Sequence, residues 1–583
     1  MIELLKQHIY DSVSISEENK IYFLKIKISE QFSFASEIKS HQGVLLTEWV
    51  SPNENSTRTL WFTLYLLSHD IYCIESELNP KFPVIQDLSS VFPVCNRLQR
   101  AIYELTRIRT RHFKDKRGWL NHDFKKVSGS GVHEIPVGPV HAGIIEPGHF
   151  RFSVVGERIL KLETQLGYTH KGIHQLLKNT SLEEAGKIIS RISGDSTVAY
   201  ASAFAIACEQ IYDYTPSRSI QLERSLCLER ERLCNHMGDI GAIVNDAGMP
   251  ALQSFFSCLK EDLLQTHVNA ASHRYLMDCI KPFADQKIFS PNCFETMKTE
   301  LEKLKNSLTE LQTIVENHFG LQDRLQRTGM ISKAQAKQLG LLGIAAKASN
   351  VDYDLRGSKK EEGIIPVTNK FSGVGTNRPE YFDFSARRQE DSNRSVYAIQ
   401  NCYEQRRRSG ISREASLHAA ERQTQGEFGW WVSDAGSGSL PTQSRKAKDD
   451  GYIYTGDVAS RVKIRFAECF ESIQYCEAFI SELMNRLESK RNDGEQTTCR
   501  DKLRLALTKK IKKYFGIGIV EGWRGPVTVI VSISSNEKIN WCHFHDPSWQ
   551  NWLALEYAVL NDIVADFPLI NKSFNLSYSG HDS

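Results

Sequence analysis

The sequence has no stretch of about 20 uncharged apolar residues, the length that a transmembrane helix needs, so we expect no membrane span. Its N-terminus, MIELLKQHIYD, carries acidic residues early and lacks the apolar core of a signal peptide. Neither charge sign is in excess, because the net charge over 583 residues is +2. This balance provides no overall field for nucleic acid, and we expect no nucleic-acid partner.

The sequence also has no CxxC pair among its thirteen cysteines. Cys227 and Cys234 are seven apart, as are Cys469 and Cys476, which is the spacing of one helix face and favours core packing. An odd number of cysteines without a pairing pattern indicates free thiols in a reducing compartment. We therefore expect a cytoplasmic chain that binds neither zinc nor an iron–sulfur cluster itself.

Short alternating runs fill the first part of the chain. They predict strands and one following helix, and so a small α+β domain over residues 1–126. The runs are Lys20–Ile28, Gly43–Val50, Leu60–Leu67 and Asp70–Ile74, and the helix is Asn96–Ile108. The basic stretch 107–126 at the end of this domain reads as a solvated linker.

Helical periodicity dominates from residue 135 onward. After a strand pair over Phe150–Leu162, we expect helices at 181–213, 217–245, 251–280, 297–318, 332–348 and 458–487. Residues 358–450 are rich in glycine, serine and arginine without a sustained period, and they predict a flexible or separately folded insertion. The fold class is therefore α+β: the N-terminal domain, then a mainly helical domain with a small sheet, built from 135–357 and 451–583.

A polar turn interrupts this helical region. In RISGDSTVAY (191–200), Gly194, Asp195, Ser196 and Thr197 stand between apolar segments, and the downstream one, 199–207, carries no charge. A glycine-bearing polar turn in apolar surroundings usually faces a cofactor, a ligand or a partner.

Two pairs of segments resemble the large subunit of membrane-bound, energy-converting nickel–iron hydrogenases, a family that includes the quinone-side subunit of respiratory complex I. They are GPVHAGIIEPGHFRF (138–152) with LGYTHKGIHQLL (166–177), and DPSWQNWLALEYAVL (546–560) with FPLINKSFNLSYSGHD (567–582). FPVIQDLSSVFPVCNRLQRAIYEL (82–105) resembles the end of a complex I partner subunit that this family often carries fused at the N-terminus. The resemblance implies the hydrogenase large-subunit fold.

That family holds its metal pair with four cysteines, in an R-x-C-G-x-C turn and a C-terminal D-P-C-x-x-C turn. Here Ser193 and Ser196 fall on the first two cysteines, and Ser577 and Gly580 on the other two. Tyr200 falls on a histidine that follows the first turn. Nickel and low-spin iron need bridging thiolates, which a neutral serine hydroxyl does not replace, so we expect no metal and no hydrogen turnover.

The resemblance implies two uses for these four ligand positions. In complex I the same place ends a quinone channel, where a histidine and a tyrosine meet the headgroup. A related group of membrane complexes lacks the cysteines. Candidate catalytic residues are His141, His149, Asp195 and Tyr200; Ser193, Ser196, Ser577 and Tyr578 would line the ligand cavity, with the histidines at its mouth.

Each candidate also has a structural interpretation. His141 and His149 could instead satisfy buried backbone groups. Asp195 could relay a proton through a raised pKa, or cap the helix that follows it. Tyr200 could donate to a quinone carbonyl or only pack.

A further polar stripe lies in the helix expected at 217–245. Glu231, Asn235 and Asp239 share one helix face, and Arg232 and His236 share another. Glu231, Asn235, His236 and Asp239 form either a proton path or a buried structural network. Asp352, Asp354 and Arg356 are expected to form an ion pair.

The resemblance implies a subunit related to NADH dehydrogenase and hydrogenase, peripheral on the inner face of the cell membrane. An iron–sulfur small subunit would pass electrons through it to a quinone-like acceptor, with antiporter-like integral membrane subunits below. The chain would bind no cofactor of its own other than the quinone as a ligand. The alternative is a non-catalytic subunit that transmits conformation to the membrane arm.

Overall fold

The computed structural model describes most of the chain in nine stretches, which are 15–18, 21–51, 59–67, 70–143, 145–284, 287–356, 454–493, 515–560 and 562–583. They belong to one compact unit, and the second unit, Gly373–Ile453, lies outside the described residues. The insertion expected at 358–450 therefore lies outside them as well. Within the described stretches, no helix combines the length and the apolarity that a membrane crossing requires.

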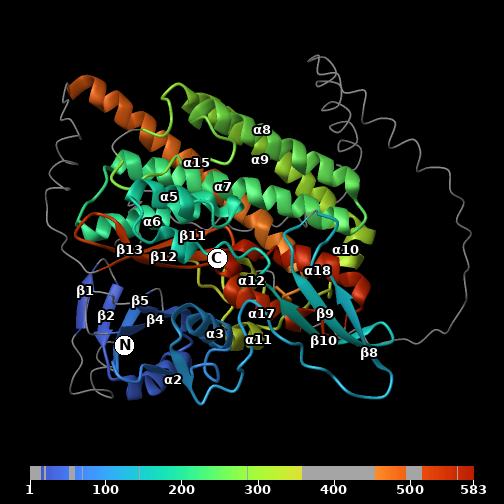
Figure 1. Ribbon diagram of the computed structural model, residues 1–583. Helices are drawn as coiled ribbons and strands as arrows, with labels where there is room; N and C mark the ends of the chain where they lie inside the picture. The colour runs from blue at the N-terminus through green and yellow to red at the C-terminus, as the bar shows by residue number, and fades with distance from the viewer. Residues whose placement is uncertain are drawn as a thin grey trace, which may run out of the picture. The chain divides into compact units, whose positions relative to one another are not determined.

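The N-terminal region forms a five-stranded sheet with the order β1-β2-β5-β4-β3, shown in blue in Figure 1. Neighbouring strands are antiparallel except β2 and β5, which are parallel. The strands are β1 (Ile15–Glu18), β2 (Ile21–Lys25), β3 (Val44–Ser51), β4 (Thr59–Leu67) and β5 (Asp70–Leu78). Two helices, α2 (Gln31–Ser40) and α3 (Cys95–Thr106), accompany them.

Both faces of this sheet are buried, and β3 is buried along its whole length. One face packs on α2 and α3 through residues such as Phe34 and Leu98. The other face joins the core of the helical region, where Trp49 stacks on Phe62 and Phe62 meets Phe515. The N-terminal region is therefore packed against the rest of its unit.

The basic stretch 107–126 is not all linker. Its strand β7 (Arg109–Arg111) pairs in parallel with β6 (Val84–Gln86). A three-stranded antiparallel sheet follows, with the order β10-β9-β8. It comprises β8 (Val132–Val137), β9 (His149–Val155) and β10 (Arg158–Gln165), and thus adds one strand to the expected pair.

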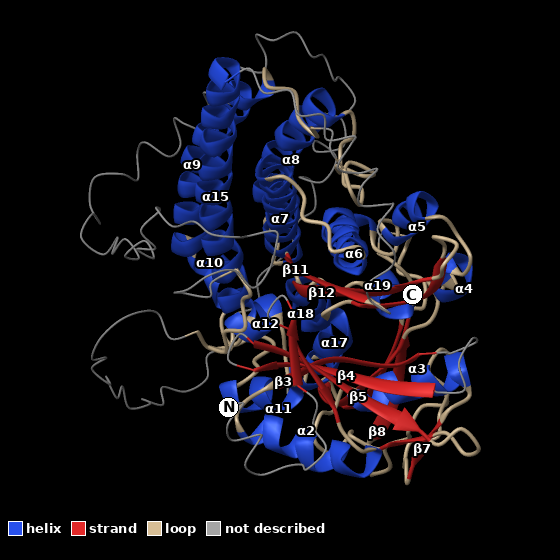
Figure 2. Ribbon diagram, turned by 90° about the vertical axis from the view of Figure 1, so that its left-hand side faces the viewer, coloured by secondary structure: helices blue, strands red, loops and turns tan. Residues whose placement is uncertain are grey.

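Long helices form the next layer, with the helix α7 (Arg218–Asp246) between α8 (Pro250–Ala271) and α15 (Val458–Asp493). Helix α9 (Cys293–Asn317) packs on α8 and α15. Figure 2 shows these helices running together above the sheets. Shorter helices α4 (Ile173–Leu177), α10 (Phe319–Leu325), α11 (Lys333–Leu339) and α12 (Gly343–Lys347) fill the remaining connections.

The C-terminal sheet, with the order β11-β12-β13, lies against α6 (Thr197–Ile211). Its strands are β11 (Gly516–Gly522), β12 (Gly525–Ile533) and β13 (Ile539–His545). At Gly518 a Cβ atom would lie 1.8 Å from the carbonyl oxygen of Ala203, so only glycine permits this approach. The chain continues through α17 (Ser548–Ala558), α18 (Phe567–Phe574) and α19 (Tyr578–Asp582). This close packing of β11 on α6 accounts for the alanines at 203 and 207.

Three helix expectations are wrong in their extent. The helix expected at 181–213 is divided into α5 (Leu182–Ile189) and α6, because the polar turn separates them. The one expected at 332–348 breaks at Gly340, where a left-handed φ of 71° ends α11. The one expected at 251–280 ends at Ala271, because Ser272 takes a left-handed φ of 63°.

Candidate functional site

The two turns that carry the four ligand positions lie against each other. Ser193 precedes a 3-10 turn (Gly194–Ser196), and Ser577 is the N-cap of α19. Their hydroxyl oxygens are 2.8 Å apart, a hydrogen bond between residues 384 positions apart in sequence. Because the two hydroxyl oxygens are in direct contact, there is no space for a metal ion between them.

The fourth ligand position, Gly580, has no room for a side chain. A Cβ atom there would lie 2.8 Å from Asp546 Oδ2 and 2.8 Å from Ser577 Oγ. The backbone N–H of Gly580 donates to Ser577 Oγ at 2.8 Å, which closes the turn. A cysteine at this position would collide with the Asp546 carboxylate.

These positions do not fit a nickel–iron pair. They offer the hydroxyls of Ser193, Ser196 and Ser577, and the hydroxyls of Ser193 and Ser577 already bond to each other. Bridging of nickel and iron requires thiolates. Across the stretches that the structure describes, no group of three or more histidine, cysteine, aspartate or glutamate residues is arranged to hold a metal ion.

Asp195 is paired with Arg524, which lies in the turn between β11 and β12. The guanidinium donates to both carboxylate oxygens, at 2.9 and 2.5 Å, and it also packs on the Trp523 ring. Burial by itself would raise the pKa of Asp195, but the Arg524 charge and hydrogen bonds from Arg524 and the hydroxyls of Ser193 and Ser196 bring it below its usual value. The proton-relay alternative for Asp195, which requires a raised pKa, is therefore wrong.

Asp195 does not cap the following helix either. The backbone N–H groups of Val198 and Ala199 donate instead to the Glu231 carboxylate, at 2.7 and 3.2 Å. Burial raises the pKa of Glu231 to about 8 even though these two hydrogen bonds lower it. Glu231 of α7 thus accepts the hydrogen bonds at the start of α6, the role that the capping alternative gave to Asp195.

Tyr200 is fully buried and donates its hydroxyl to Asp546 Oδ2 at 3.2 Å. Burial raises the pKa of both groups, that of Tyr200 well above its ordinary value. Asp546 also accepts from the backbone N–H of Ser548 at the start of α17.

Sequence reasoning named neither Asp546 nor Arg524 as a site residue. A signal for each existed. Asp546 opens the quoted DPSW motif, and Arg524 is a charged residue between two apolar strand patterns, beside Gly522 and Gly525.

The 138–148 loop reaches the C-terminal tail through Glu146 and Gly148. Glu146 accepts from the backbone N–H and the hydroxyl of Ser579, at 3.1 and 3.2 Å. Gly148 lies against the Tyr578 ring, because a Cβ atom there would be 2.6 Å from it. The tail and the loop are therefore in contact, as the expected site requires.

The two histidines make other contacts. His141 Nε2 bonds to the carbonyl oxygen of Gly148 at 2.7 Å, as the backbone interpretation of this residue expects. His149 packs on the Phe124 ring, and its Nε2 has no hydrogen-bond partner in the described part of the chain. Burial lowers the pKa of His149, and the charge of Arg151 lowers it further.

The polar residues of α7 fall into two groups, one on each helix face, as their spacing in the sequence predicted. Asn235 donates to the carbonyl oxygen of Asp195 at 2.7 Å, and Asp239 pairs with Arg465 at 2.9 Å and accepts from Asn575 at 2.6 Å. His236 lies on the other face and bonds to Glu468 at 2.7 Å. Glu231, Asn235 and Asp239 thus face the turn and the tail, whereas His236 belongs to a separate cluster.

That second cluster is a buried network of charges centred on Glu468. Its oxygens accept from His236, from Lys347 at 2.5 Å and from Arg232 at 3.3 Å. The expected pair of Asp354 and Arg356 is present at 2.8 Å, and Arg356 extends the network to Glu229 at 3.2 Å.

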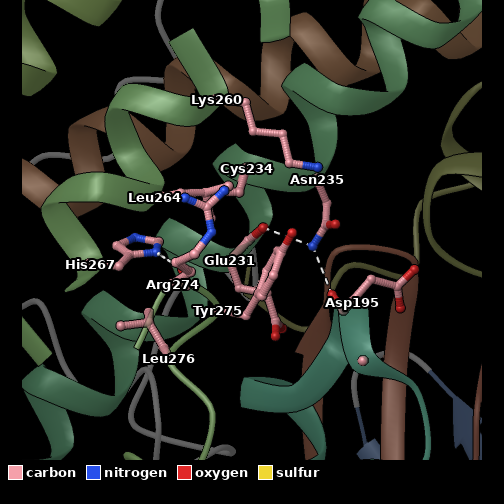
Figure 3. Close-up of a pocket in the computed structure, with 11 residues that line it drawn as sticks. Asp195, Glu231, Cys234, Asn235, Lys260, Leu264, His267, Arg274, Tyr275 and Leu276 are labelled. Carbon is pink, nitrogen blue, oxygen red and sulfur yellow. Dashed lines mark hydrogen bonds between the residues drawn. The ribbon is translucent and has the colours of Figure 1, made fainter. Parts of the chain in front are cut away.

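A small pocket lies beside Asp195 (Figure 3). The residues that line it include Asp195, Glu231, Asn235, Lys260, His267 and Tyr275. Its volume is about 20 Å³, enough for one water molecule but not for a quinone ring. His267, one of the lining residues, has a buried Nε2 without a hydrogen-bond partner among the described residues.

Known proteins resemble parts of this chain. Residues 246–428 match the family described as "Respiratory-chain NADH dehydrogenase, 49 Kd subunit". The carbon monoxide-induced hydrogenase of Rhodospirillum rubrum is 23% identical over 226 residues, which is 39% of this chain and 63% of that protein. A subunit of the F(420)H(2) dehydrogenase of Methanosarcina mazei is 24% identical over 271 residues, covering 46% of this chain and 71% of that one.

Another relative is a subunit of the NADH-quinone oxidoreductase of Helicobacter pylori, 25% identical over 39% of this chain and 54% of that protein. The chain thus spans less than two thirds of the hydrogenase and of this oxidoreductase subunit. A solved structure of the membrane-bound sulfane sulfur reductase, an archaeal respiratory membrane complex, has the same fold. It matches with a TM-score of 0.56 and 16% identity over 78% of this chain and 99% of that one. The chain is therefore similar, over part of its length, to the 49 kDa subunit of the respiratory-chain NADH dehydrogenase and to subunits of related hydrogenase and dehydrogenase complexes, and it shares the fold of the solved structure.

Proposed function

We propose that this chain is the metal-free large subunit of a membrane-associated respiratory oxidoreductase complex. It receives electrons from the cluster of an iron–sulfur small subunit and passes them to a quinone-like acceptor, and this transfer is coupled to ion translocation by antiporter-like membrane subunits. The chain itself is peripheral, on the cytoplasmic face. Relatives that are subunits of such complexes support this assignment.

The observation that carries the proposal is the direct hydrogen bond between Ser193 and Ser577. It joins the two turns that correspond, by the resemblance, to the metal-binding turns of the hydrogenases. The groups in contact are serine hydroxyls, which exchange hydrogen bonds and do not bind nickel or iron. The surrounding side chains are also acids or hydrogen-bond donors, namely Asp195, Tyr200, Arg524 and Asp546. Such a site suits chemistry in which protons accompany electrons.

Glu231 is the group that would supply a proton. Its pKa of about 8 leaves the buried carboxyl protonated at neutral pH. It lines the one-water pocket beside Asp195, and Asn235 connects the same helix face to the Asp195 carbonyl. Since this pocket excludes a quinone ring, the acceptor would bind at the 138–148 loop, next to His141 and His149.

A non-catalytic coupling subunit is the second candidate. The lack of space for a side chain at Gly580 favours it, because a subunit that only transmits conformation needs no ligand cavity. In that case the Asp195–Arg524 pair and the Glu468 network would serve rigidity alone.

Quinone reduction by the assembled complex distinguishes the two candidates. Asp195→Asn and His149→Gln should abolish electron transfer to a quinone while the complex still assembles, as judged by co-purification of its subunits. Glu310→Gln, an exposed change on α9, is the control. If both variants assemble and keep full activity, the redox proposal is wrong and the coupling role stands.

A further inference from the structure

The basic stretch 107–126 forms one wall of a cavity that the proposed function does not use. The cavity has a volume of about 770 Å³, which is within the range of roughly 300–1,000 Å³ typical of ligand sites. Ser89 and Asn96 line it from the N-terminal region, and residues 114–118, 121–123 and 125 line it from the loop.

The loop is held in place by specific contacts. Arg117 binds both carboxylate oxygens of Asp115, at 2.8 and 2.7 Å, and also pairs with Glu163. Arg100 donates to the carbonyl oxygen of Gly118 at 3.0 Å, and Glu104 accepts from the backbone N–H of Trp119 at 2.7 Å. The cavity wall is thus a built element rather than a freely solvated linker.

The side chains that line the cavity carry a surplus of positive charge. Four are basic and two are acidic, which leaves two positive charges uncompensated; they are Lys114, Lys116, Arg117 and Lys125 against Asp115 and Asp123. Asp115 is already paired with Arg117 and lies 3.7 Å from Lys125. Within the described part of the chain, Lys114 and Lys116 have no carboxylate within ion-pair distance.

His122 adds a buried polar group to this cavity. Its side chain is only 5% exposed, its Nε2 lies 4.0 Å from Glu163, and its Nδ1 has no partner among the described residues. Burial, together with the charges of Arg100, Arg117 and Arg97, lowers the pKa of His122 to about 4, although Glu163 opposes this shift. The same positive field that disfavours a charged imidazole favours a bound anion.

We infer that this cavity binds a small tetrahedral dianion, a sulfate or a phosphate group, through Lys114, Lys116 and His122. A dianion compensates the two surplus charges of the wall. Its oxygens accept hydrogen bonds from the two ammonium groups, and such charge-assisted bonds are the strong ones. The buried imidazole then gains the partner that it lacks. This inference does not depend on the proposed function of the chain.

Calorimetric titration of the full chain with sodium sulfate tests the site, because sulfate keeps two negative charges throughout pH 5–8. We expect saturable binding of one sulfate per chain. Lys114→Gln combined with Lys116→Gln should weaken it at least about tenfold, since two charge-assisted contacts are lost. The matched control is Lys303→Gln with Lys305→Gln, which removes the same charge from the exposed face of α9. No saturable binding, or equal loss in both double variants, would overturn the inference.

The pH dependence of sulfate binding tests whether His122 contacts the anion. A bound dianion raises the pKa of this imidazole, so sulfate should bind more tightly at pH 5 than at pH 7, and His122→Gln should reduce this difference. Parallel pH profiles for both proteins would contradict the site as assigned. Vesicles of phosphatidic acid identify the source of the group: binding that sulfate displaces indicates a lipid headgroup, and sulfate binding without vesicle binding indicates a free anion.

Discussion

The Glu231 carboxylate, on α7, accepts the backbone N–H of Val198 at the start of α6 at 2.7 Å. A buried acid from one helix thereby serves as the N-terminal acceptor of another, although Asp195 stands next to that terminus in sequence. The contact fixes the orientation of the helix that carries Tyr200, and it has consequences for stability.

Glu231 should make the stability of the chain fall as the pH rises. Because burial raises its pKa from 4.5 to about 8, the folded chain keeps this proton between those values whereas the unfolded chain releases it. Each pH unit within this window therefore costs up to about 1.4 kcal/mol. Melting temperatures at pH 6 and pH 8.5 should fall less in Glu231→Gln than in the wild type. An equal fall in melting temperature for the wild type and Glu231→Gln would show that Glu231 does not hold the proton. Glu310→Gln, an exposed replacement, is the control.

Loss of the Asp195 carboxylate should destabilise the chain by about 1–3 kcal/mol. Asp195→Asn removes the carboxylate that pairs with the guanidinium of Arg524, and the Arg524 side chain is only 5% exposed. The cost is smaller than for a fully buried pair because Asp195 is itself 39% exposed. Chemical unfolding measures it, and a double-mutant cycle with Arg524→Gln isolates the pair.

An exposed pair of similar geometry is the control for that cycle. Arg191 binds Asp278 through two hydrogen bonds, but the side chains are 44% and 36% exposed. Asp278→Asn should therefore cost less than about 1 kcal/mol. If Asp195→Asn and Asp278→Asn lower the free energy of unfolding equally, the burial of Arg524 does not determine the contribution of its ion pair to stability.

Purified, folded chain should contain only trace nickel. The four ligand positions are three serines and a glycine, and Gly580 has no space for a ligand side chain. Elemental analysis by mass spectrometry measures the metal. Stoichiometric nickel that is lost in Ser193→Ala or Ser577→Ala would contradict the assignment.

Proteolysis should cut first within 358–450. This segment is rich in glycine, serine and arginine without a hydrophobic period. The fragments on either side should stay associated, because α7 packs on α15 and α6 packs on β11 and β12. Limited digestion followed by gel filtration tests this expectation. Early cleavage within 181–245, with 358–450 protected, would show that the segment belongs to the core.

The sequence by itself determined the class of elements and the identity of the polar turn. Strand alternation and helical periodicity depend on local spacing, so the long helix α7 and the faces of its polar stripe were predictable. The absence of thiolates at Ser193, Ser196, Ser577 and Gly580 is likewise a property of the sequence, once the resemblance aligns it. Helix ends were less predictable, because the left-handed residues Ser272 and Gly340 stop helices that their apolar spacing would continue.

Only the tertiary structure decided which groups meet at the site. Ser193 bonds to Ser577 across 384 residues, and Asp195 is held ionised by Arg524 from a distant hairpin. The pKa of a carboxyl depends on the charges and the solvent around it, which are set by segments that no local pattern connects. For the same reason Glu231 rather than Asp195 holds a proton. Residues near each other in sequence could be assigned a role, but the buried partner that determines their chemistry comes from elsewhere in the fold.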